Sequence, residues 1–479
     1  MPANGVERTR TKIVVTLGPA SSSPQMVEEL IRAGMDVARL NLSHGSWEEH
    51  SRLCREVRAI SGRLQREVAV LMDLPGPKYR IGKLKDGSAV WKKGAAVTLT
   101  TREVPGDSAA VSVNFPTLPR DARVGKTILV DDGNLELKVT AVKEYEVITR
   151  VVQGGVITPG RGVVIPGVHV SEPFLTDLTR RNLEFAIGEA PDYLALSFVT
   201  SASDVEQVRE IAAQRGMNIP LISKIERAEA IRSFDRILAS SDGIMVARGD
   251  MGVEIPLQKV PLVQKEIIRK CNHAGKAVIT ATQMLESMIG SIRPTRAEVT
   301  DVANAILDGT DAVMLSAETS VGKYPRAAVR TMDRIARETE RHLPYDQMLA
   351  ERGDWLKHET DELISYNACY TASRLKAAAI VAYTQSGSTA RRVSKNRPSV
   401  PILAITPDPQ VARRMVLYWG VNAYVVPNPT SMDELLEKAS RLARELGVAK
   451  KGDLIVITGG LPLGVSGSTN LLKVQTIQD

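Results

Sequence analysis

Eight short apolar runs, rich in β-branched residues, recur along the chain, and amphipathic helical segments separate successive runs. The runs span residues 12–17, 37–42, 68–73, 193–198, 220–225, 243–248, 277–282 and 312–317. Strand-like runs that alternate with helical segments predict βα units and a parallel sheet. Eight such units predict a TIM (β/α)8 barrel. The expected fold class is therefore α/β.

The alternation breaks twice, and each break predicts a further domain. Between residues 73 and 170, Val/Thr-rich runs alternate with Gly, Pro and Asp turns, which indicates an inserted all-β lid domain. After the polar stretch 342–354, five strands (379–384, 401–405, 423–426, 454–458 and 473–477) alternate with helices and predict a C-terminal doubly wound α/β domain. We expect barrel segments at 1–72 and 171–345, the β-barrel-like lid at 73–170 and the C-terminal domain at 355–479.

The composition narrows the kind of partner. No run approaches the roughly 20 apolar residues of a membrane helix, and the first ten residues lack the apolar core of a signal peptide. We therefore expect a cytoplasmic protein with no membrane contact. The formal net charge is +7, but the basic residues are scattered and aromatic residues make up only 4% of the chain. This favours small phosphorylated ligands over nucleic acid, which would need a base-stacking surface.

Polar and charged residues lie at the C-terminal ends of five of the eight predicted strands. They are Arg39, Asn41, Ser43 and His44 at the second, Asp73 at the third, Lys224 and Glu226 at the fifth, Arg248 and Asp250 with Gly249 between them at the sixth, and Thr282 at the seventh. Working residues of a TIM barrel lie at the C-terminal ends of its strands, so these side chains should share one mouth. A solvated loop charge explains any one of them alone. Their placement at so many strand ends favours an active site.

Glu226 and Asp250 come from neighbouring strands and offer two hard carboxylates. So few protein ligands suit Mg²⁺ (or Mn²⁺), which keeps waters and substrate oxygens in its shell. An ion pair with Lys224 or Arg248 is the structural alternative. Gly249 is expected to allow a tight turn before Asp250. The sequence has neither a Walker GxxxxGK[ST] motif nor a GxGxxG motif after a strand, so a dehydrogenase is disfavoured and a nucleotide would need another architecture.

Five segments together resemble the signatures of pyruvate kinases. They are 35–45 (MDVARLNLSHG), 224–226 (KIE), 242–250 (DGIMVARGD), 281–288 (ATQMLESM) and 294–299 (PTRAEV), in the order of that family. The similarity runs essentially end to end and includes the inserted β-domain and the C-terminal domain. The resemblance implies Mg²⁺-dependent phosphoryl transfer from phosphoenolpyruvate to ADP, which gives pyruvate and ATP.

The resemblance also implies a role for each matching residue. The implied substrate-binding residues are Arg39, Lys224, Gly249, Asp250 and Thr282, and those facing the nucleotide phosphates are Asn41, His44 and Arg80. Glu226 and Asp250 would hold the magnesium ion, and a second ion would arrive with ADP. Lys224 and Arg39 would neutralise the transferring phosphoryl group, which needs positioning and electrostatic stabilisation more than covalent help. A water network near Thr282 would protonate the enolate. The family also implies a homotetramer.

The chain departs from the family pattern at two places. Many relatives carry a glutamate where this chain has Lys78, and they bind a potassium ion nearby. The residues of this monovalent-cation region are Asn41, Ser43, Asp73, Leu74 and Lys78. A fixed ammonium can replace a mobile cation, so we expect that K⁺ is not required; a solvent-facing Lys78 is the alternative. Leu178 replaces a lysine that is attributed to the nucleotide, which puts the nucleotide preference in question.

A loop in the C-terminal domain resembles the place where relatives bind sugar-phosphate effectors. It follows a predicted strand, opens a helix and contains Thr384, Ser386, Gly387, Ser388 and Thr389. Its hydroxyls and amides suit a phosphate, although an ordinary N-cap by Ser388 explains the same residues locally. The basic residues Arg391, Arg392 and Lys395 on the following helix favour an anion.

Two other functions stay open from the sequence. A metal-dependent pyruvate-type aldolase or lyase would also use Glu/Asp metal ligands in a barrel and stabilise an enolate, but it has no use for ADP. A non-catalytic phosphometabolite sensor would keep the fold without turnover. The capping β-domain with Arg80 argues against the first, and the intact Lys224, Glu226, Asp250 and Thr282 argue against the second.

Overall fold

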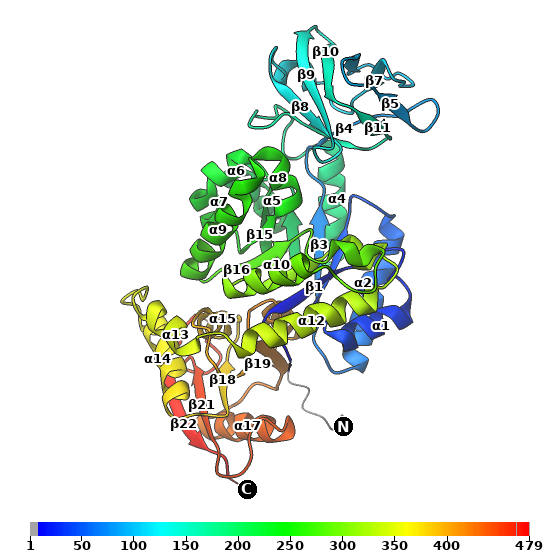
Figure 1. The fold of residues 1–479 in the computed structure, drawn as a ribbon. Coiled ribbons are helices and arrows are strands. Elements are labelled where there is room, and N and C mark those ends of the chain that lie inside the picture. Colours follow the sequence, from blue (N-terminus) through cyan, green and yellow to red (C-terminus); the bar gives the residue numbers. More distant parts are fainter. Residues whose placement is uncertain (1–7, 466, 479) are drawn as a thin grey trace.

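The computed structural model describes residues 8–465 and 467–478. Its centre is a closed barrel of eight parallel strands in the spatial order β1-β17-β16-β15-β14-β13-β3-β2 (Figure 1). The strands are β1 (Lys12–Thr16), β2 (Val37–Asn41), β3 (Ala69–Leu74), β13 (Tyr193–Leu196), β14 (Leu221–Ile225), β15 (Gly243–Ala247), β16 (Ala277–Ala281) and β17 (Ala312–Leu315). Each of the eight expected runs contains or overlaps one strand, so the predicted TIM (β/α)8 barrel is confirmed.

Helices surround the barrel and connect its strands. They are α1 (Pro24–Ala33), α2 (Trp47–Arg63), α4 (Asp177–Gly188), α5 (Ala202–Gln214), α6 (Ala228–Arg232), α7 (Phe234–Ser240), α8 (Arg248–Glu254), α9 (Val260–Ala274), α10 (Arg296–Leu307), α11 (Ala317–Ser320) and α12 (Pro325–Arg341), with 3-10 turns at Leu257–Lys259 and Glu286–Ile289. Capping boxes fix the starts of α2 (Ser46 with Glu49) and α10 (Thr295 with Glu298). Among the described residues, no helix has both the length and the apolarity needed to span a membrane.

Side chains along each barrel strand alternate between two environments, as a period of two requires. On β1, Ile13 and Val15 belong to the hydrophobic cluster that includes the surrounding helices. Val14 belongs to a second cluster, with Leu71 and Met245, that continues into the C-terminal domain. All five side chains are fully buried, and each contributes about 1.5–3 kcal/mol by leaving water. This packing holds the strand ends in fixed positions around the mouth.

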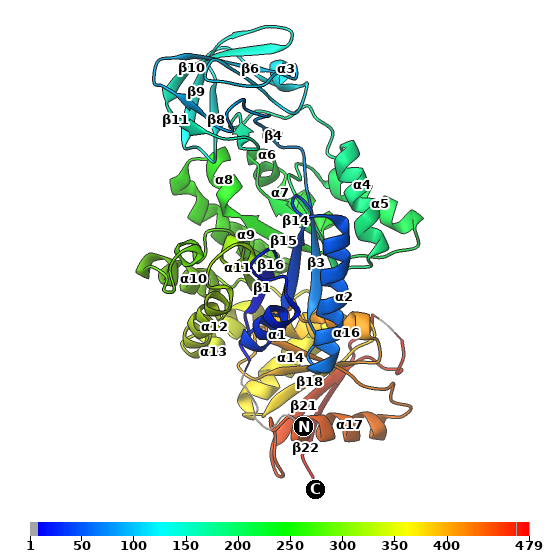
Figure 2. The same ribbon diagram turned by 90° about the vertical axis from the view of Figure 1, so that its right-hand side faces the viewer.

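The inserted domain interrupts the barrel between β3 and α4. Its strands are β4 (Tyr79–Arg80), β5 (Ala89–Trp91), β6 (Ala96–Thr100), β7 (Ala110–Ser112), β8 (Thr127–Val130), β9 (Leu135–Val142), β10 (Glu146–Gln153), β11 (Gly155–Ile157) and β12 (Gly162–Val164), with one helical turn, α3 (Leu118–Asp121). Seven strands form a mixed sheet in the order β4-β12-β8-β9-β10-β6-β7, and β11 pairs with β5. The domain lies over one end of the barrel in both Figure 1 and Figure 2.

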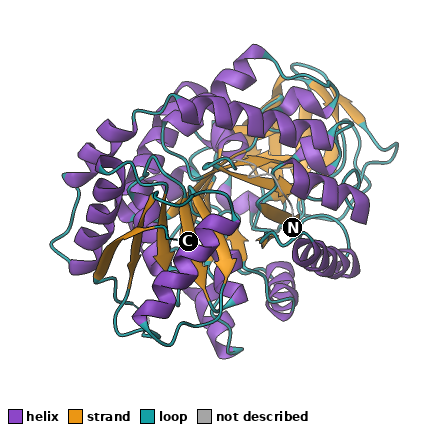
Figure 3. Cartoon of the chain, turned by 90° about the horizontal axis from the view of Figure 1, so that it is seen from below, coloured by secondary structure: helices purple, strands orange, loops and turns teal. Residues whose placement is uncertain are grey.

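The C-terminal domain is a five-stranded sheet in the order β20-β19-β18-β21-β22, with helices on its faces (Figure 3). Its elements are α13 (Tyr345–Gly353), α14 (Thr360–Arg374), β18 (Ala379–Tyr383), α15 (Ser388–Lys395), β19 (Ile402–Thr406), α16 (Pro409–Met415), β20 (Val421–Val425), α17 (Met432–Glu445), β21 (Leu454–Gly459) and β22 (Leu471–Thr476). Four strands are parallel, and the edge strand β22 runs antiparallel to β21. The predicted doubly wound α/β domain is thus confirmed.

The C-terminal domain docks at the end of the barrel opposite the inserted domain (Figure 1). Lys12 Nζ, at the start of β1, donates to the Val421 carbonyl at 2.7 Å, and Arg397 pairs with Asp311 at 2.9 Å. Both barrel residues lie at N-terminal strand ends, so the opposite, C-terminal ends face the inserted domain.

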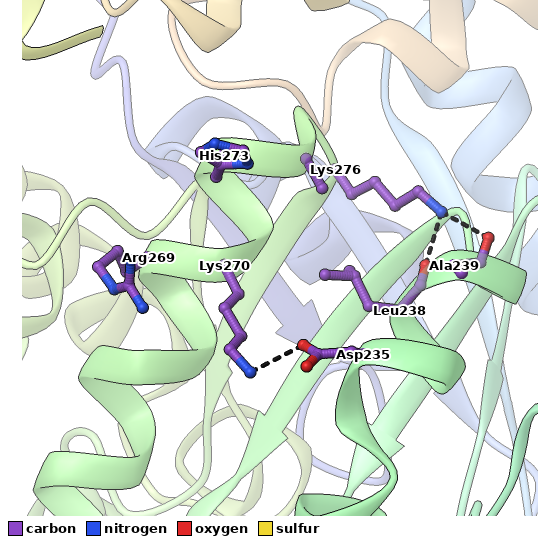
Figure 4. Close-up of a pocket in the computed structure, with 8 residues that line it drawn as sticks. Asp235, Leu238, Ala239, Arg269, Lys270, His273 and Lys276 are labelled. Atoms are coloured by element: carbon purple, nitrogen blue, oxygen red, sulfur yellow. Dashed lines mark hydrogen bonds and ion pairs between the residues drawn. The ribbon is translucent and has the colours of Figure 1, made fainter. Parts of the chain in front are cut away.

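A cavity of about 370 Å³ lies on the flank of the barrel between α7 and α9 (Figure 4). It is lined by Asp235, Leu238, Ala239, Arg269, Lys270, His273, Ala274 and Lys276. Lys276 Nζ donates to the carbonyls of Leu238 and Ala239 near the C-terminus of α7, and Lys270 pairs with Asp235 at 2.8 Å. Lys276 thus places a positive charge at the C-terminus of α7, and Lys270 forms an ion pair with a neighbouring helix. The cavity lies toward the N-terminal strand ends, away from the mouth.

Candidate active site

Three ionised side chains from β2, β3 and β14 meet inside the mouth. Arg39 Nε and Nη2 each lie 2.8 Å from Asp73 Oδ2, and Lys224 Nζ lies 3.4 Å from Asp73 Oδ1. Asp73 is only 1% exposed. Burial pushes the pKa of Asp73 up, but Lys224 and Arg39 outweigh it, so the pKa of this carboxyl lies below its usual value. Asp73 therefore stays ionised and fixes the two cations.

Lys224 is held by more than Asp73. Its Nζ lies 2.9 Å from Glu226 Oε1 and donates to Ser197 Oγ at 2.7 Å. Burial opposes its charge, but Asp73 and Glu226 raise the pKa of Lys224 above its usual value. Lys224 is thus a permanent, rigidly placed positive charge.

The sequence analysis missed Ser197 and Phe198, which follow β13. Ser197 Oγ donates to Asp73 Oδ1 at 3.1 Å, and the Phe198 backbone N–H donates to Glu226 Oε2 at 2.6 Å. Both residues lie at a strand end, within or beside the fourth expected run. That position was a usable signal, because a hydroxyl at a strand end of a barrel points to the mouth.

The surroundings of the Glu226 carboxylate favour the binding of a cation. Its Oε1 is buried and accepts no hydrogen bond, because Lys224 pairs with it without hydrogen-bond geometry. Burial raises the pKa of Glu226, Lys224 opposes this rise and Asp250 adds to it. Among the described residues, no group of three or more His, Cys, Asp or Glu side chains converges as a metal site. Two carboxylates, of which Glu226 Oε1 is contacted by the ammonium of Lys224, fit Mg²⁺, which fills its shell with water and substrate oxygens.

Asp250, in the first turn of α8, is contacted from the inserted domain's side. Lys78 Nζ lies 2.6 Å from Asp250 Oδ1 and 3.8 Å from Asp132 Oδ1. Burial would raise the pKa of Asp250, but Lys78 more than offsets this and lowers it. The Lys78 side chain is 13% exposed, so the solvent-facing alternative for this residue is wrong. Asp73, Glu226 and Asp250 are thus each paired with at least one of the cations Arg39, Lys224 and Lys78.

Thr282, directly after β16, has a backbone in the left-handed region with φ of 67°. Its Oγ1 accepts a hydrogen bond from the Gly249 N–H at 2.8 Å. A ligand carboxylate at this amide would have to replace that bond. The expected tight turn at Gly249 is wrong: the residue lies inside α8, its φ is not positive, and an added Cβ would make only ordinary contacts with Thr282.

Of the residues expected to face the nucleotide, Asn41 and His44 lie at or just after the end of β2, and Arg80 lies in the inserted domain. Arg80 of β4 donates to the Gly160 carbonyl at 2.9 Å. Burial lowers the pKa of His44, and repulsion from Arg80 and Arg39 adds to this effect. His44 is therefore neutral near pH 7, and the positive charge available for a phosphate here comes from the arginines.

The remaining residues of the monovalent-cation region lie at the ends of β2 and β3. Asn41 Oδ1 accepts from the Ser43 N–H at 3.2 Å, and Leu74 is buried. Leu178, in the first turn of α4, is 55% exposed. An exposed leucine offers no charge to a phosphate.

The loop 384–389 of the C-terminal domain differs from the prediction in the residue that caps helix α15. The N-cap of α15 is Gly387, with φ of 85°, and Ser388 is the first helical residue, so the alternative of an N-cap by Ser388 is wrong. Glycine is favoured at this positive φ because it has no Cβ. Thr384 Oγ1 accepts from the Gly387 N–H at 2.9 Å, Ser386 Oγ lies 3.2 Å from Ser388 Oγ, and Thr389 Oγ1 lies 2.9 Å from Thr469 Oγ1.

The three cations that follow this loop face elsewhere. Arg391 donates to the Gly275 carbonyl of the barrel, Arg392 pairs with Asp361, and Lys395 pairs with Glu362. These pairings do not support the expectation that the three cations favour an anion at the loop, where hydroxyls and amides of residues 384–389 are the available groups.

Comparison with known proteins identifies the family. The family model "Pyruvate kinase, barrel domain" matches residues 8–329, and "Pyruvate kinase, alpha/beta domain" matches residues 362–475. The chain is 46% identical over 475 residues to a pyruvate kinase of Geobacillus stearothermophilus, covering 98% of this chain and 81% of that protein. It is 44% identical over 471 residues to a pyruvate kinase of Clostridium acetobutylicum, covering 98% of this chain and 100% of that protein.

A solved structure agrees with these matches. The crystal structure of a pyruvate kinase from Cryptosporidium parvum superposes with a TM-score of 0.93 at 37% identity, covering 100% of this chain and 98% of that chain. The resemblance stated from the sequence is thereby confirmed. The chain belongs to the pyruvate kinase family of phosphotransferases.

Proposed function

We propose that the chain transfers the phosphoryl group of phosphoenolpyruvate to ADP, with Mg²⁺ and without K⁺. The observation that carries the proposal is the placement of Lys224 beside Asp73 and Glu226, inside a mouth that also contains Asp250 and Arg39. Phosphoryl transfer needs charge stabilisation and positioning, and this mouth supplies both. ADP-dependent release of pyruvate tests the proposal, because an aldolase or lyase would release pyruvate without ADP.

The chain's residues divide the work as follows. Arg39 and Lys224 bind the transferring phosphoryl group and offset its charge. Glu226 and Asp250 would hold the magnesium ion, which would supply positive charge to the phosphoryl oxygens. Thr282, with the amides of Gly249 and Asp250, binds the substrate carboxylate, and water ordered by Thr282 delivers the proton to the enolate.

The inserted domain acts as a lid. It lies over the mouth, and its entering segment contributes Lys78 to Asp250. A lid that excludes water protects the phosphoryl group from hydrolysis during transfer. The nucleotide enters under this lid, where Asn41, His44 and Arg80 contact its phosphates; a second magnesium ion would be bound by the nucleotide.

A sensor without turnover is the second candidate. The ion pairs of Lys224 with Asp73 and Glu226 argue against it, because they preserve the charges that phosphoryl transfer needs.

The loop 384–389 is proposed to bind a sugar phosphate and to regulate the enzyme. We expect sugar mono- or bisphosphates to lower the phosphoenolpyruvate concentration at half-saturation by several-fold, and Thr384→Val to remove this response. The measurement is initial rate against phosphoenolpyruvate with and without each sugar phosphate. An unresponsive wild-type chain would contradict the effector proposal and leave the kinase untouched.

A homotetramer is proposed as the assembled form. Several large apolar side chains on the barrel flank are exposed in the single chain: Leu257, Leu262, Ile292, Leu307 and Val321. Exposed apolar side chains of this kind favour burial against another copy. Sedimentation velocity should show one species of four times the chain mass. A monomer at micromolar concentration would refute this assembly.

A further inference from the structure

Arg227 has contacts that none of the roles above explains. It follows Glu226 directly, at the end of β14, and it is only 6% exposed. A buried guanidinium is costly unless polar groups or aromatic faces compensate it. Arg227 contacts Pro77, in the segment that enters the inserted domain, and the ring of Phe198, and its charge acts on Glu254, which accepts a hydrogen bond from the segment that leaves that domain.

The first contact is with the segment that enters the inserted domain. Arg227 Nη2 donates to the Pro77 carbonyl at 2.8 Å. Its guanidinium carbon lies 5.1 Å from the ring centroid of Phe198, and Lys78 Nζ lies 5.7 Å from the same ring. One aromatic ring thus contacts both cations, each at cation–π distance. Because Pro77 and Lys78 are adjacent, Arg227 fixes the backbone immediately before the lysine that reaches Asp250.

The entering segment has little freedom to settle elsewhere. A Cβ on Gly76 would collide with the Ser197 carbonyl, so the segment lies directly on the backbone that follows β13. A Cβ on Gly162 of β12 would collide with the Lys78 side chain, which therefore threads between the barrel and the inserted sheet. These close approaches make the position of Lys78 sensitive to a shift of Pro77.

The segment that leaves the inserted domain rests on Glu254. The Gly167 N–H donates to Glu254 Oε2 at 3.3 Å. Burial raises the pKa of Glu254, and the positive charge of Arg227 is the largest opposing influence. Arg227 therefore helps to keep Glu254 ionised as an acceptor for the second segment. Arg227 thus contacts one connection of the domain directly and acts on the other only through its charge.

We propose that Arg227 is the positioning residue that sets the inserted domain over the mouth and, through Pro77, places Lys78 against Asp250. The consequence for catalysis rests on the proposed function, whereas the hold on the two connecting segments does not. The test therefore measures the segments themselves, by hydrogen–deuterium exchange of peptides covering residues 75–82 and 162–169.

Three variants make the exchange experiment specific. Arg227→Gln removes the charge, and we expect exchange in both peptides to become about 10- to 100-fold faster, since a hydrogen bond from a charged donor and its electrostatic support are lost. Arg227→Lys keeps the charge near Phe198 and Glu254 but loses the planar fork, so an intermediate increase is expected. Arg232→Gln changes an exposed arginine on the same helix, α6, and should behave as the wild type.

Activity supplies a second readout. We expect kcat/KM for phosphoenolpyruvate to fall about tenfold in Arg227→Gln and to recover in part in Arg227→Lys, a rescue that a loss of stability alone would not give. If Arg227→Gln fails to fold, Arg227→Lys carries the exchange test. Wild-type exchange of both peptides in every folded Arg227 variant would overturn the proposal, whatever the activity, and so would equal effects in the Arg232 variant.

Discussion

Lys224→Met should abolish turnover while leaving the fold intact. The ammonium of Lys224 lies between Asp73 Oδ1 and Glu226 Oε1, and Arg39, which pairs with the other oxygen of Asp73, does not occupy that position. Methionine matches the aliphatic stem but carries no charge for the transferring phosphoryl group. Loss of one such cation costs phosphoryl-transfer enzymes about 10³-fold or more in kcat. Steady-state pyruvate formation with a coupled assay measures the change.

The fold should survive this substitution for a specific reason. Asp73 keeps Arg39 and Ser197, and without Lys224 the pKa of Glu226 rises further, so Glu226 accepts a proton instead of remaining a buried, unpaired charge. Circular dichroism and thermal unfolding check this expectation. Lys85→Met is the matched control, since it removes an exposed ion pair with Asp107 in the inserted domain and should retain wild-type turnover. Turnover of Lys224→Met within tenfold of the wild type would refute the role assigned to Lys224.

Lys78→Glu should make turnover depend on potassium, which we expect the wild-type chain not to need. The substitution removes the fixed cation at Asp250 and places a second carboxylate beside it. Like charges at this distance repel strongly in a partly buried site. In a buffer without monovalent activators, we expect kcat/KM for phosphoenolpyruvate to fall about 100-fold. Added potassium chloride should restore most of the activity, because the mobile ion takes over the positive charge.

Two controls distinguish the replacement of the Lys78 charge by potassium from a general effect of salt and from the added carboxylate. Choline chloride at equal ionic strength should not restore Lys78→Glu, which excludes general screening. Lys78→Met removes the charge without adding a carboxylate, so it should show a smaller loss and the same rescue by potassium. A Lys78→Glu enzyme that is equally active with potassium and with choline would contradict the idea that Lys78 replaces a bound cation.

Many residues of the mouth could be predicted from sequence, because residues at the C-terminal ends of the barrel strands all lie at the same end of the barrel. Once β14 and β15 are placed, Glu226 and Asp250 must lie at one end of adjacent strands. The barrel strand boundaries differ from the expected runs by at most two residues at either end. The apolar alternation and the flanking turns therefore carried enough information for the strands and for the residues that follow them.

Contacts between distant segments could not be predicted in this way. Lys78 reaches Asp250 across 172 positions, and Arg227 reaches Pro77 across 150, because the inserted domain folds back over the mouth. No local pattern in either segment encodes that approach. Phe198 likewise reads as an ordinary apolar strand residue until its ring is found beside two cations.

The stretch 342–354 shows a different limit. Its polarity gave no periodic signal, yet α13 forms there and buries Leu349 and Arg352. Arg352 Nε donates to the Lys395 carbonyl at 2.6 Å, and its guanidinium lies 5.6 Å from the Trp355 ring. An analysis of apolar spacing treats arginine as polar even where its side chain is buried. It therefore does not detect a helix that is stabilised by the tertiary contacts of a buried arginine.

The most direct test of the account is pyruvate formation by the wild-type chain from phosphoenolpyruvate and ADP, with magnesium chloride and no potassium or other activating monovalent cation. The account predicts strong activity that requires both ADP and magnesium and that potassium chloride does not raise beyond the choline control. Activity that appears only with potassium would keep the kinase but contradict the role of Lys78. Pyruvate release without ADP, or no release under either condition, would contradict the proposed phosphoryl transfer itself.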